Sequence, residues 1–378
     1  MRRYGLWRDA QAVHRSSISK ARRKISWEFF KDLFEDAVRL AYNTIPVTPN
    51  MLWFGMSVYA IDGSQFILPA TQNIRETFDP DSGLSTNGKG HFPYCLVSTL
   101  YDVFRRIPVA RTIVDSKGSE REEAARLLKQ LPTKRNLFLF DRGYPSFELI
   151  HLLTSMKNTA FIFRCYTTST FNVITDFANK GFDQGELHMD PTDNFLSNVP
   201  KENRKKINPI KLRIIRMVSP SDGTVSVLLT NLYNKSKFSS QDIIDLYFKR
   251  WEIEVYYRDE KTVLDVTQFH ARTVNGVLQE MYAIAIMSVL ARTMIHLSSE
   301  FILEGKHMPQ FKNTIVALSS DVGHLVSDDP EKAAWIFKEL LQEISRVVYH
   351  RPLIKRRPQP RVNKGPNNKW KYRKRRKI

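Results

Sequence analysis

The chain has 378 residues, of which 42% are hydrophobic and 26% are charged, a balance typical of a folded globular protein and not of a disordered one. Its two cysteines exclude a disulfide framework, and we find neither a signal peptide nor an apolar run of about eighteen residues that would predict a membrane span. We therefore expect a soluble cytoplasmic protein. Its formal net charge of +19 favours a polyanionic partner.

Residues 1–50 are predicted to be helical. They contain a basic segment, SSISKARRKIS, and an amphipathic segment, WEFFKDLFEDAVRLAY, whose apolar residues recur at helical spacing. The basic side chains either contact phosphate or form a solvated helix face, and the sequence leaves both interpretations open.

Residues 51–158 predict an α/β unit. Three β-rich runs, SVYAIDGSQFIL, HFPYCLVSTLYDV and PVARTIVDS, indicate a three-stranded meander. A helix is expected next, because Ser119 and Glu122 have the spacing of a capping box. The run NLFLF then has the length of a buried strand, and Asp141 and a Gly-Tyr-Pro turn separate it from another helix.

The remaining chain divides into four predicted regions. Residues 159–235 form a β-rich insertion, in which the polar stretch 176–208 is expected to be an exposed loop. Residues 236–305 and 306–350 are predicted to be helical. The tail 351–378 contains thirteen basic residues and no acidic ones, which makes nucleic acid the favoured polyanion.

Two aspartates follow strand-like runs in the α/β unit. Asp62 ends the apolar part of the first run, and Asp141 directly follows the buried strand. A single aspartate at a strand end is more often a turn residue, so neither signal is specific alone. If the two strands are neighbours in the sheet, however, the two carboxylates converge.

A third carboxylate is predicted from the helix that contains residues 247–261. At 100° per residue, Tyr247, Glu254 and Lys261 lie on one face, and two arginines, Arg250 and Arg258, flank them. The neighbouring acids Glu252 and Glu260 point about 160° and 120° away from Glu254 and are excluded. A solvated helix face with paired charges remains the alternative.

Three carboxylates without His or Cys partners suit Mg²⁺ or Mn²⁺, which prefer oxygen ligands. Two such ions would activate an attacking water or 3′-hydroxyl and stabilise the leaving oxygen during phosphoryl transfer. Arg250, Arg258 and Lys261 would then bind DNA phosphates beside the metals, and Tyr247 could hydrogen-bond another phosphate.

The spacing Tyr247-x2-Arg250-x3-Glu254-x6-Lys261, with Trp251 directly after the arginine, resembles the Tyr-Arg-Glu-Lys signature of DDE transposases of the insertion-sequence-four group. The surroundings IDGS at Asp62 and FDRGY at Asp141 agree, and the resemblance extends from about residue 15 to about residue 300. It implies an RNase H-like mixed-sheet core, interrupted by the β-rich insertion and flanked by the helical N-terminal segment and the basic tail.

The resemblance also implies site roles. The catalytic residues and ligands of two Mg²⁺ or Mn²⁺ ions would be Asp62, Asp141 and Glu254. The DNA-binding residues would be Tyr247, Arg250, Trp251, Arg258, Lys261 and Arg142. Residues 1–50 would be a shortened DNA-binding region.

The implied activity is cut-and-paste transposition in the prokaryotic cytoplasm, at the nucleoid. A homodimer would act on double-stranded DNA, namely inverted-repeat ends and a target, without a membrane. A metal-dependent nuclease of the same fold and a non-catalytic DNA-binding relative remain alternatives. We interpret His91 and His270 as structural residues.

Overall fold

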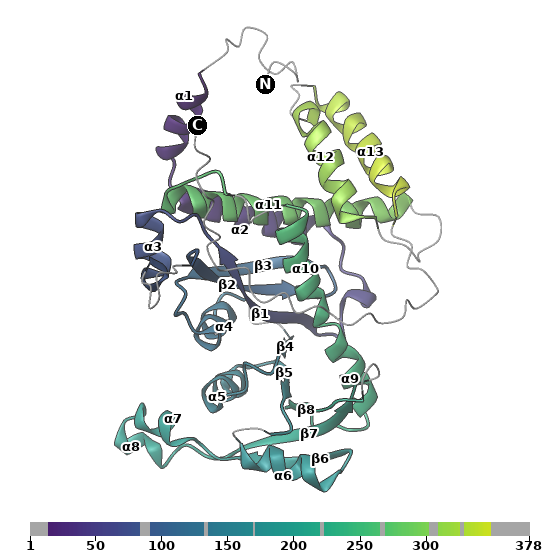
Figure 1. Ribbon diagram of the computed structural model, residues 1–378. Helices are drawn as coiled ribbons and strands as arrows, with labels where there is room; N and C mark the ends of the chain where they lie inside the picture. Colours follow the sequence, from purple (N-terminus) through teal and green to yellow (C-terminus); the bar gives the residue numbers. More distant parts are fainter. Residues whose placement is uncertain are drawn as a thin grey trace.

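Figure 1 shows the computed structural model, which describes residues 14–83, 91–131, 135–168, 171–219, 223–264, 269–301, 309–325 and 329–348. The basic tail predicted at 351–378 lies outside the described residues.

One eight-stranded mixed sheet runs through the molecule in the order β3-β2-β1-β4-β5-β8-β7-β6. Its strands are β1 (Ser57–Ile67), β2 (Tyr94–Asp102), β3 (Ile107–Val114), β4 (Asn136–Phe140), β5 (Thr159–Cys165), β6 (Gln184–Met189), β7 (Ile210–Val218) and β8 (Val225–Thr230). The first three form the predicted antiparallel meander, and β4 and β5 follow with parallel pairing to β1 and β4. This is the RNase H-like arrangement that the resemblance implied.

Helices cover both faces of the sheet (Figure 1). Alternate strand residues share one apolar core with α9 (Ser240–Phe248) and α10 (Trp251–Thr262). The opposite residues share a second core with α4 (Glu120–Leu128), α5 (Phe147–Ser155) and α6 (Asn172–Lys180). The predicted order of three strands, helix, strand and helix is therefore confirmed, with α3 (Gln72–Phe78) added between β1 and β2.

A helical layer lies beyond the β3 edge. The two predicted N-terminal helices are α1 (Arg15–Arg23) and α2 (Trp27–Thr44), and α2 packs along the long helix α11 (Val274–Ser298). The far part of α11 packs against α12 (Phe311–Leu325) and α13 (Pro330–Arg346), which confirms the helices expected there. By length and composition α11 could cross a membrane, but it is half buried here as the central helix of this layer.

The segment 159–235 differs from its prediction in two ways. Its strands are not set apart, because β5 pairs with β4, and β8, β7 and β6 continue the same sheet. The stretch 176–208, expected as a loop, contains the end of α6, the strand β6, and two short helices, α7 (Asp193–Ser197) and α8 (Lys201–Arg204). β6 is an edge strand in which three of six residues are exposed and only Met189 is buried, so its apolar pattern is weaker than that of the other strands.

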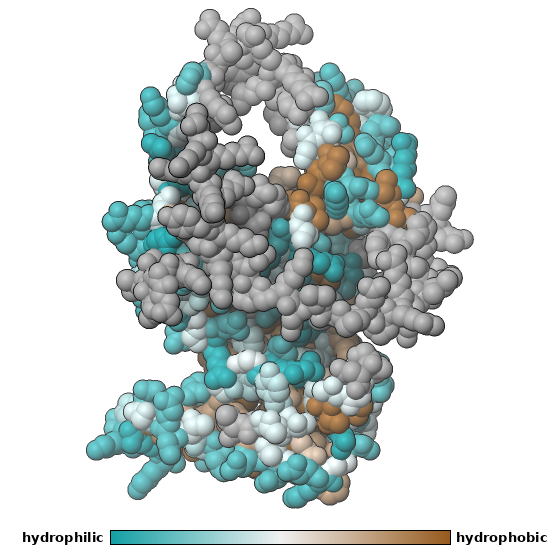
Figure 2. All heavy atoms as spheres, viewed as in Figure 1, coloured by the Kyte–Doolittle hydropathy of each residue, from teal (hydrophilic) through white to brown (hydrophobic). Residues whose placement is uncertain are grey.

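Figure 2 shows a mainly hydrophilic surface, with hydrophobic residues gathered where α12 and α13 lie in Figure 1. On these two helices the large apolar side chains of Val316 and Trp335 are 57% and 63% exposed.

Candidate active site

The parallel pairing of β1 with β4 places the two predicted aspartates side by side. Ala60 pairs with Leu139 at the last recorded position, so Asp62 and Asp141 follow two residues later on their strands. Side chains alternate along a strand, and Ala60 and Leu139 belong to the core beneath α9 and α10. The two aspartates therefore share that face of the sheet, at the point where β4 has ended.

The charge environment confirms their proximity. Burial raises the pKa of Asp62 to about 7, Arg250 opposes this shift, and the carboxylates of Glu120 and Asp141 reinforce it. Such a pKa marks a carboxylate held away from water beside other negative charges, a common feature of functional sites.

The predicted single helix across residues 240–264 is two helices. Lys249 is the C-cap of α9 and Arg250 is the N-cap of α10, both with α-helical dihedral angles, and the backbone hydrogen bonds across the junction tighten to i→i−3. This turn keeps the chain direction nearly helical, so Tyr247 and Glu254 still approach the same region. Tyr247 donates its hydroxyl to Asp141 Oδ1 at 3.3 Å.

Arg250 is the cation at the centre of this region. Only 6% of it is exposed, and its guanidinium donates to Glu254 Oε1 at 2.5 Å. The pKa of Arg250 is raised, because neighbouring Tyr247, Asp141 and Glu254 together outweigh the effect of burial. Arg250 thus neutralises the acidic site, and Glu254, whose side chain is 34% exposed, is held by this arginine.

α10 is fixed along β1 by two of its residues. The Tyr257 hydroxyl lies 2.7 Å from the carbonyl oxygen of Asp62 and donates a hydrogen bond to it. One turn further, Lys261 Nζ donates to Ser64 Oγ at 2.7 Å and to the Gln65 carbonyl at 2.9 Å. The predicted phosphate contact of Lys261 therefore competes with bonds inside the protein.

The other predicted DNA-binding residues lie around this centre. Trp251 is 50% exposed, and Arg258 is exposed one turn after Glu254 on α10. Arg142, which follows Asp141, stacks its guanidinium over the ring of Tyr166 at 4.8 Å. Their roles in binding DNA stay predictions.

The two excluded glutamates lie outside the site, as the helical spacing predicted. Glu252 pairs with Arg106 at 2.9 Å, and Glu260 pairs with buried Arg111 at 2.7 Å. The first pair attaches α10 to the loop between β2 and β3, and the second attaches it to β3, on the side away from the aspartates.

Glu120 is a carboxylate of the site that the sequence did not identify. It is the first residue of α4, and burial together with nearby Asp141 raises its pKa. Ser119 is the N-cap as predicted, although its side chain makes no capping hydrogen bond. Three acidic residues occupy this first turn, and nothing in the sequence distinguishes Glu120 from the other two.

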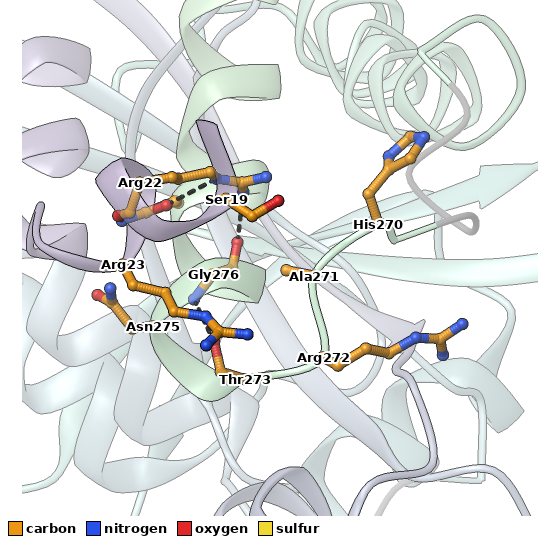
Figure 3. Close-up of a pocket in the computed structure, with 10 residues that line it drawn as sticks. Ser19, Arg22, Arg23, His270, Ala271, Arg272, Thr273, Asn275 and Gly276 are labelled. Atoms are coloured by element: carbon orange, nitrogen blue, oxygen red, sulfur yellow. Dashed lines mark hydrogen bonds between the residues drawn. The ribbon is translucent and has the colours of Figure 1, made fainter. Parts of the chain in front are cut away.

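A basic cavity of about 210 Å³ lies between α1 and the start of α11 (Figure 3). Arg22 crosses this junction, donating to Gln279 Oε1 at 2.9 Å and to the Gly276 carbonyl at 2.9 Å. Arg272 and His270 extend from the loop that precedes α11 (Figure 3).

His91 lies elsewhere, with its ring nitrogen Nε2 3.1 Å from Oδ2 of buried Asp79, which supports its structural interpretation.

The donor chemistry of the site fits a hard divalent cation, because two carboxylates converge without His or Cys. Among the described residues, however, no group of three or more His, Cys, Asp and Glu side chains is arranged to hold a metal ion. Glu254 points to Arg250 instead of joining the aspartates. The site therefore presents two convergent ligands, and its predicted third ligand is engaged elsewhere.

The sheet and the paired aspartates define an RNase H-like domain with a carboxylate site. The chain belongs to the transposase DDE domain family, whose model matches residues 53–290 and so includes every residue of this site. It is 24% identical over 284 residues to the transposase InsG for insertion sequence element IS4 of Escherichia coli strain K12. That match covers 73% of this chain and 60% of the relative.

Among solved structures, the chain is similar to a piggyBac transposase in a synaptic complex with hairpin DNA, with a TM-score of 0.40 and 10% identity. This similarity covers 76% of the chain and 57% of the piggyBac chain.

Proposed function

We propose that this chain is a DNA transposase that excises and inserts an insertion sequence by metal-dependent phosphoryl transfer. The main support for this proposal is the position of Asp62 and Asp141. They lie two residues after Ala60 and Leu139, the last residues that pair between the neighbouring parallel strands β1 and β4. Family membership and the Tyr-Arg-Glu-Lys spacing support it.

Asp62 and Asp141 would hold Mg²⁺ or Mn²⁺, and Glu254 would complete the ligand set for two ions. When bound, the ions supply an activated attacking oxygen and stabilise the leaving one. The protein's part is to hold the aspartates on a rigid sheet and to position the helix that carries the glutamate.

Arg250 connects DNA binding to completion of this site. A guanidinium binds phosphate as well as carboxylate in a bidentate geometry, so a DNA phosphate can replace the partly exposed Glu254 carboxylate as the partner of Arg250. When Arg250 exchanges Glu254 for phosphate, Glu254 becomes free to turn toward the two aspartates. DNA and cation would therefore assemble the site together.

The remaining DNA contacts are proposed from charge and exposure. Exposed Arg258 and Trp251 on α10 flank the aspartates, and Tyr247 and Arg142 lie beside Asp141. Lys261 would contribute positive charge from α10, where it is hydrogen-bonded to Ser64 and Gln65 of β1. Arg22 of the cavity at α1 and α11 is paired with Glu280 at 2.8 Å, and the other arginines that line this cavity, Arg23 and Arg272, would bind backbone phosphate further along the duplex.

A homodimer on two inverted-repeat ends is the proposed active form, since joining both ends to one target requires two sites. The chain spans about 60% of the length of the curated relative that it matches. The complete transposition reaction is therefore part of this proposal. We place the activity at the prokaryotic nucleoid in the cytoplasm.

The test incubates the purified protein with Mg²⁺, labelled element ends and supercoiled target DNA. The proposal expects joined product that is lost in Asp62→Asn and retained in the control Asp245→Asn, an exposed acid of α9. Cleavage without joining would favour the nuclease alternative. DNA retardation without cleavage would favour the non-catalytic alternative and contradict the proposal.

A further inference from the structure

Arg164 occupies the strand position next to Asp141. The pairing of β4 with β5 is last recorded between Phe140 and Phe163, so Asp141 and Arg164 each follow one residue later. Side chains alternate along a strand, and Ile162, two residues before Arg164, belongs to the core beneath α9 and α10. Arg164 therefore lies on the same face of the sheet as Asp141.

Asp62, Asp141 and Arg164 form a row across β1, β4 and β5, which are neighbours in the sheet. Adjacent strands lie about 4.8 Å apart, so the backbone of Arg164 is about 10 Å from that of Asp62. The surroundings of Tyr247, whose hydroxyl donates to Asp141, agree with this arrangement. Burial raises the pKa of Tyr247, and both Arg250 and Arg164 oppose this shift. The row of two acids thus ends in a cation.

A neutral partner holds the Arg164 guanidinium in place. Its Nε and Nη2 donate to Ser226 Oγ on β8, at 3.1 Å and 2.9 Å, and Ser226 is 3% exposed. Within the part of the chain that the structure describes, this hydroxyl is the hydrogen-bond partner of Arg164, and no carboxylate pairs with it. Arg111 and Arg250 differ, because each pairs with a glutamate. The charge of Arg164 is therefore fixed in position without being neutralised.

We propose that Arg164 binds a backbone phosphate of the DNA strand, next to the phosphate that reacts at Asp62 and Asp141. This inference rests on the proposed function. A guanidinium matches phosphate oxygens with two parallel N–H bonds, and here it extends from the rigid sheet and not from a helix. Phosphate contacts fix the register of a strand and carry no sequence information. Arg164 would therefore position the strand over the aspartates without selecting its sequence.

The test measures DNA affinity by fluorescence anisotropy, in Mg²⁺, with the full chain and a labelled element-end duplex. The duplex ends in a 3′-deoxy nucleotide, so it lacks the attacking hydroxyl. In a series of such duplexes, one terminal phosphate at a time is replaced by an uncharged methylphosphonate. The variant is Arg164→Gln, and the matched control is Arg216→Gln on β7. Arg216 is also partly buried, but it lies on the opposite face, because its neighbours Ile215 and Met217 belong to the core beneath α9 and α10.

We expect Arg164→Gln to weaken binding of the unmodified duplex about 10- to 100-fold, the effect of losing a hydrogen bond to a charged group. One methylphosphonate position should weaken wild-type binding by a similar factor. The same position should weaken Arg164→Gln little further, because the contact is already lost. Arg216→Gln should follow the wild type at every position.

Equal affinity in wild type, Arg164→Gln and Arg216→Gln would overturn the Arg164 inference and leave the proposed function intact. A loss in Arg164→Gln that adds fully to the methylphosphonate effect at every position would also overturn it, because the arginine would then act only on the fold. Failure of the wild type to bind the element end would instead contradict both the inference and the proposed function.

Two further variants keep the test decisive if Arg164→Gln does not fold. Arg164→Lys keeps the charge and loses the paired N–H geometry, so it should bind more weakly at the same phosphate and keep the wild-type dependence on salt. In a folded Arg164→Gln the salt slope should fall by about 0.9, as for one lost phosphate contact. Ser226→Ala removes the support of the guanidinium, and its smaller loss should be confined to the same phosphate. Losses in these two variants at unrelated phosphates would overturn the inference.

Discussion

The buried ion pair that holds α10 in place gives the most quantitative prediction. Arg111 on β3 and Glu260 on α10 have side chains that are 2% and 1% exposed, and they pair at 2.7 Å. Arg111 also donates to the Met281 carbonyl at 3.2 Å, so one guanidinium joins β3, α10 and α11. Removing one partner of a buried pair leaves an uncompensated charge, which costs about 3–5 kcal/mol.

We therefore expect Glu260→Leu to lower the free energy of unfolding by about 3–5 kcal/mol in urea denaturation followed by circular dichroism. The double variant Arg111→Met/Glu260→Leu should recover most of this loss, because it removes both charges. The control is Glu252→Gln at the partly exposed pair with Arg106, where about 0.2–1 kcal/mol is expected. A cost for Glu260→Leu no larger than that of the control would refute this account of how α10 is anchored.

Three further predictions concern charge at the site and beyond it. Arg250→Ala should lower metal-free stability by about 1–3 kcal/mol and increase the thermal stabilisation by Mg²⁺, and an unchanged Mg²⁺ response would contradict the role of this arginine as a counter-cation. Lys261→Met should cost about 1.5–3 kcal/mol in urea unfolding, because two hydrogen bonds to Ser64 and Gln65 are lost, and a neutral result would show that they do not anchor α10. Deleting residues 351–378 should flatten the dependence of DNA affinity on salt while leaving Mn²⁺ affinity unchanged, and an unaltered salt slope would exclude the tail from DNA binding.

The sheet was predictable where local patterns carried the information. The three strands of the meander and the buried strand before Asp141 have strong β composition and clear ends. Their alternation also predicts which residues face a core. β6 escaped prediction because it lies at the sheet edge with exposed side chains, and its position depends on β7 as partner. The continuity of the sheet through β5 and β8 likewise depends on long-range pairing.

The candidate site was predictable only in part. Asp141 follows β4 as predicted, whereas Asp62 lies inside β1, which continues to Ile67 instead of ending there. Both aspartates could still be chosen from the sequence, and helical spacing brings Glu254 toward them. The same spacing excluded Glu252 and Glu260. Helical spacing could not show that Arg250 pairs with Glu254. The rotamers of these two side chains depend on the charges that the fold brings together around them.

Glu120 shows a different limit of sequence reasoning. Its neighbours Glu122 and Glu123 have the same chemistry and share its helical turn. Its position against Gly63, 57 positions earlier in the chain, separates it from exposed Glu122 and from Glu123, which pairs with Arg126. Such a contact arises from tertiary packing and leaves no local pattern.

The central claim is that Asp62 and Asp141 hold a divalent cation that Glu254 joins when DNA releases it from Arg250. The most direct test is a crystal structure of the protein with Mn²⁺ and an element-end duplex, in which anomalous scattering locates the ions. Our account predicts an ion bound by both aspartates, at carboxylate distances of about 2.0–2.3 Å, with Glu254 turned toward it and Arg250 on a phosphate. Anomalous peaks remote from both aspartates, with Arg250 still paired to Glu254, would contradict it.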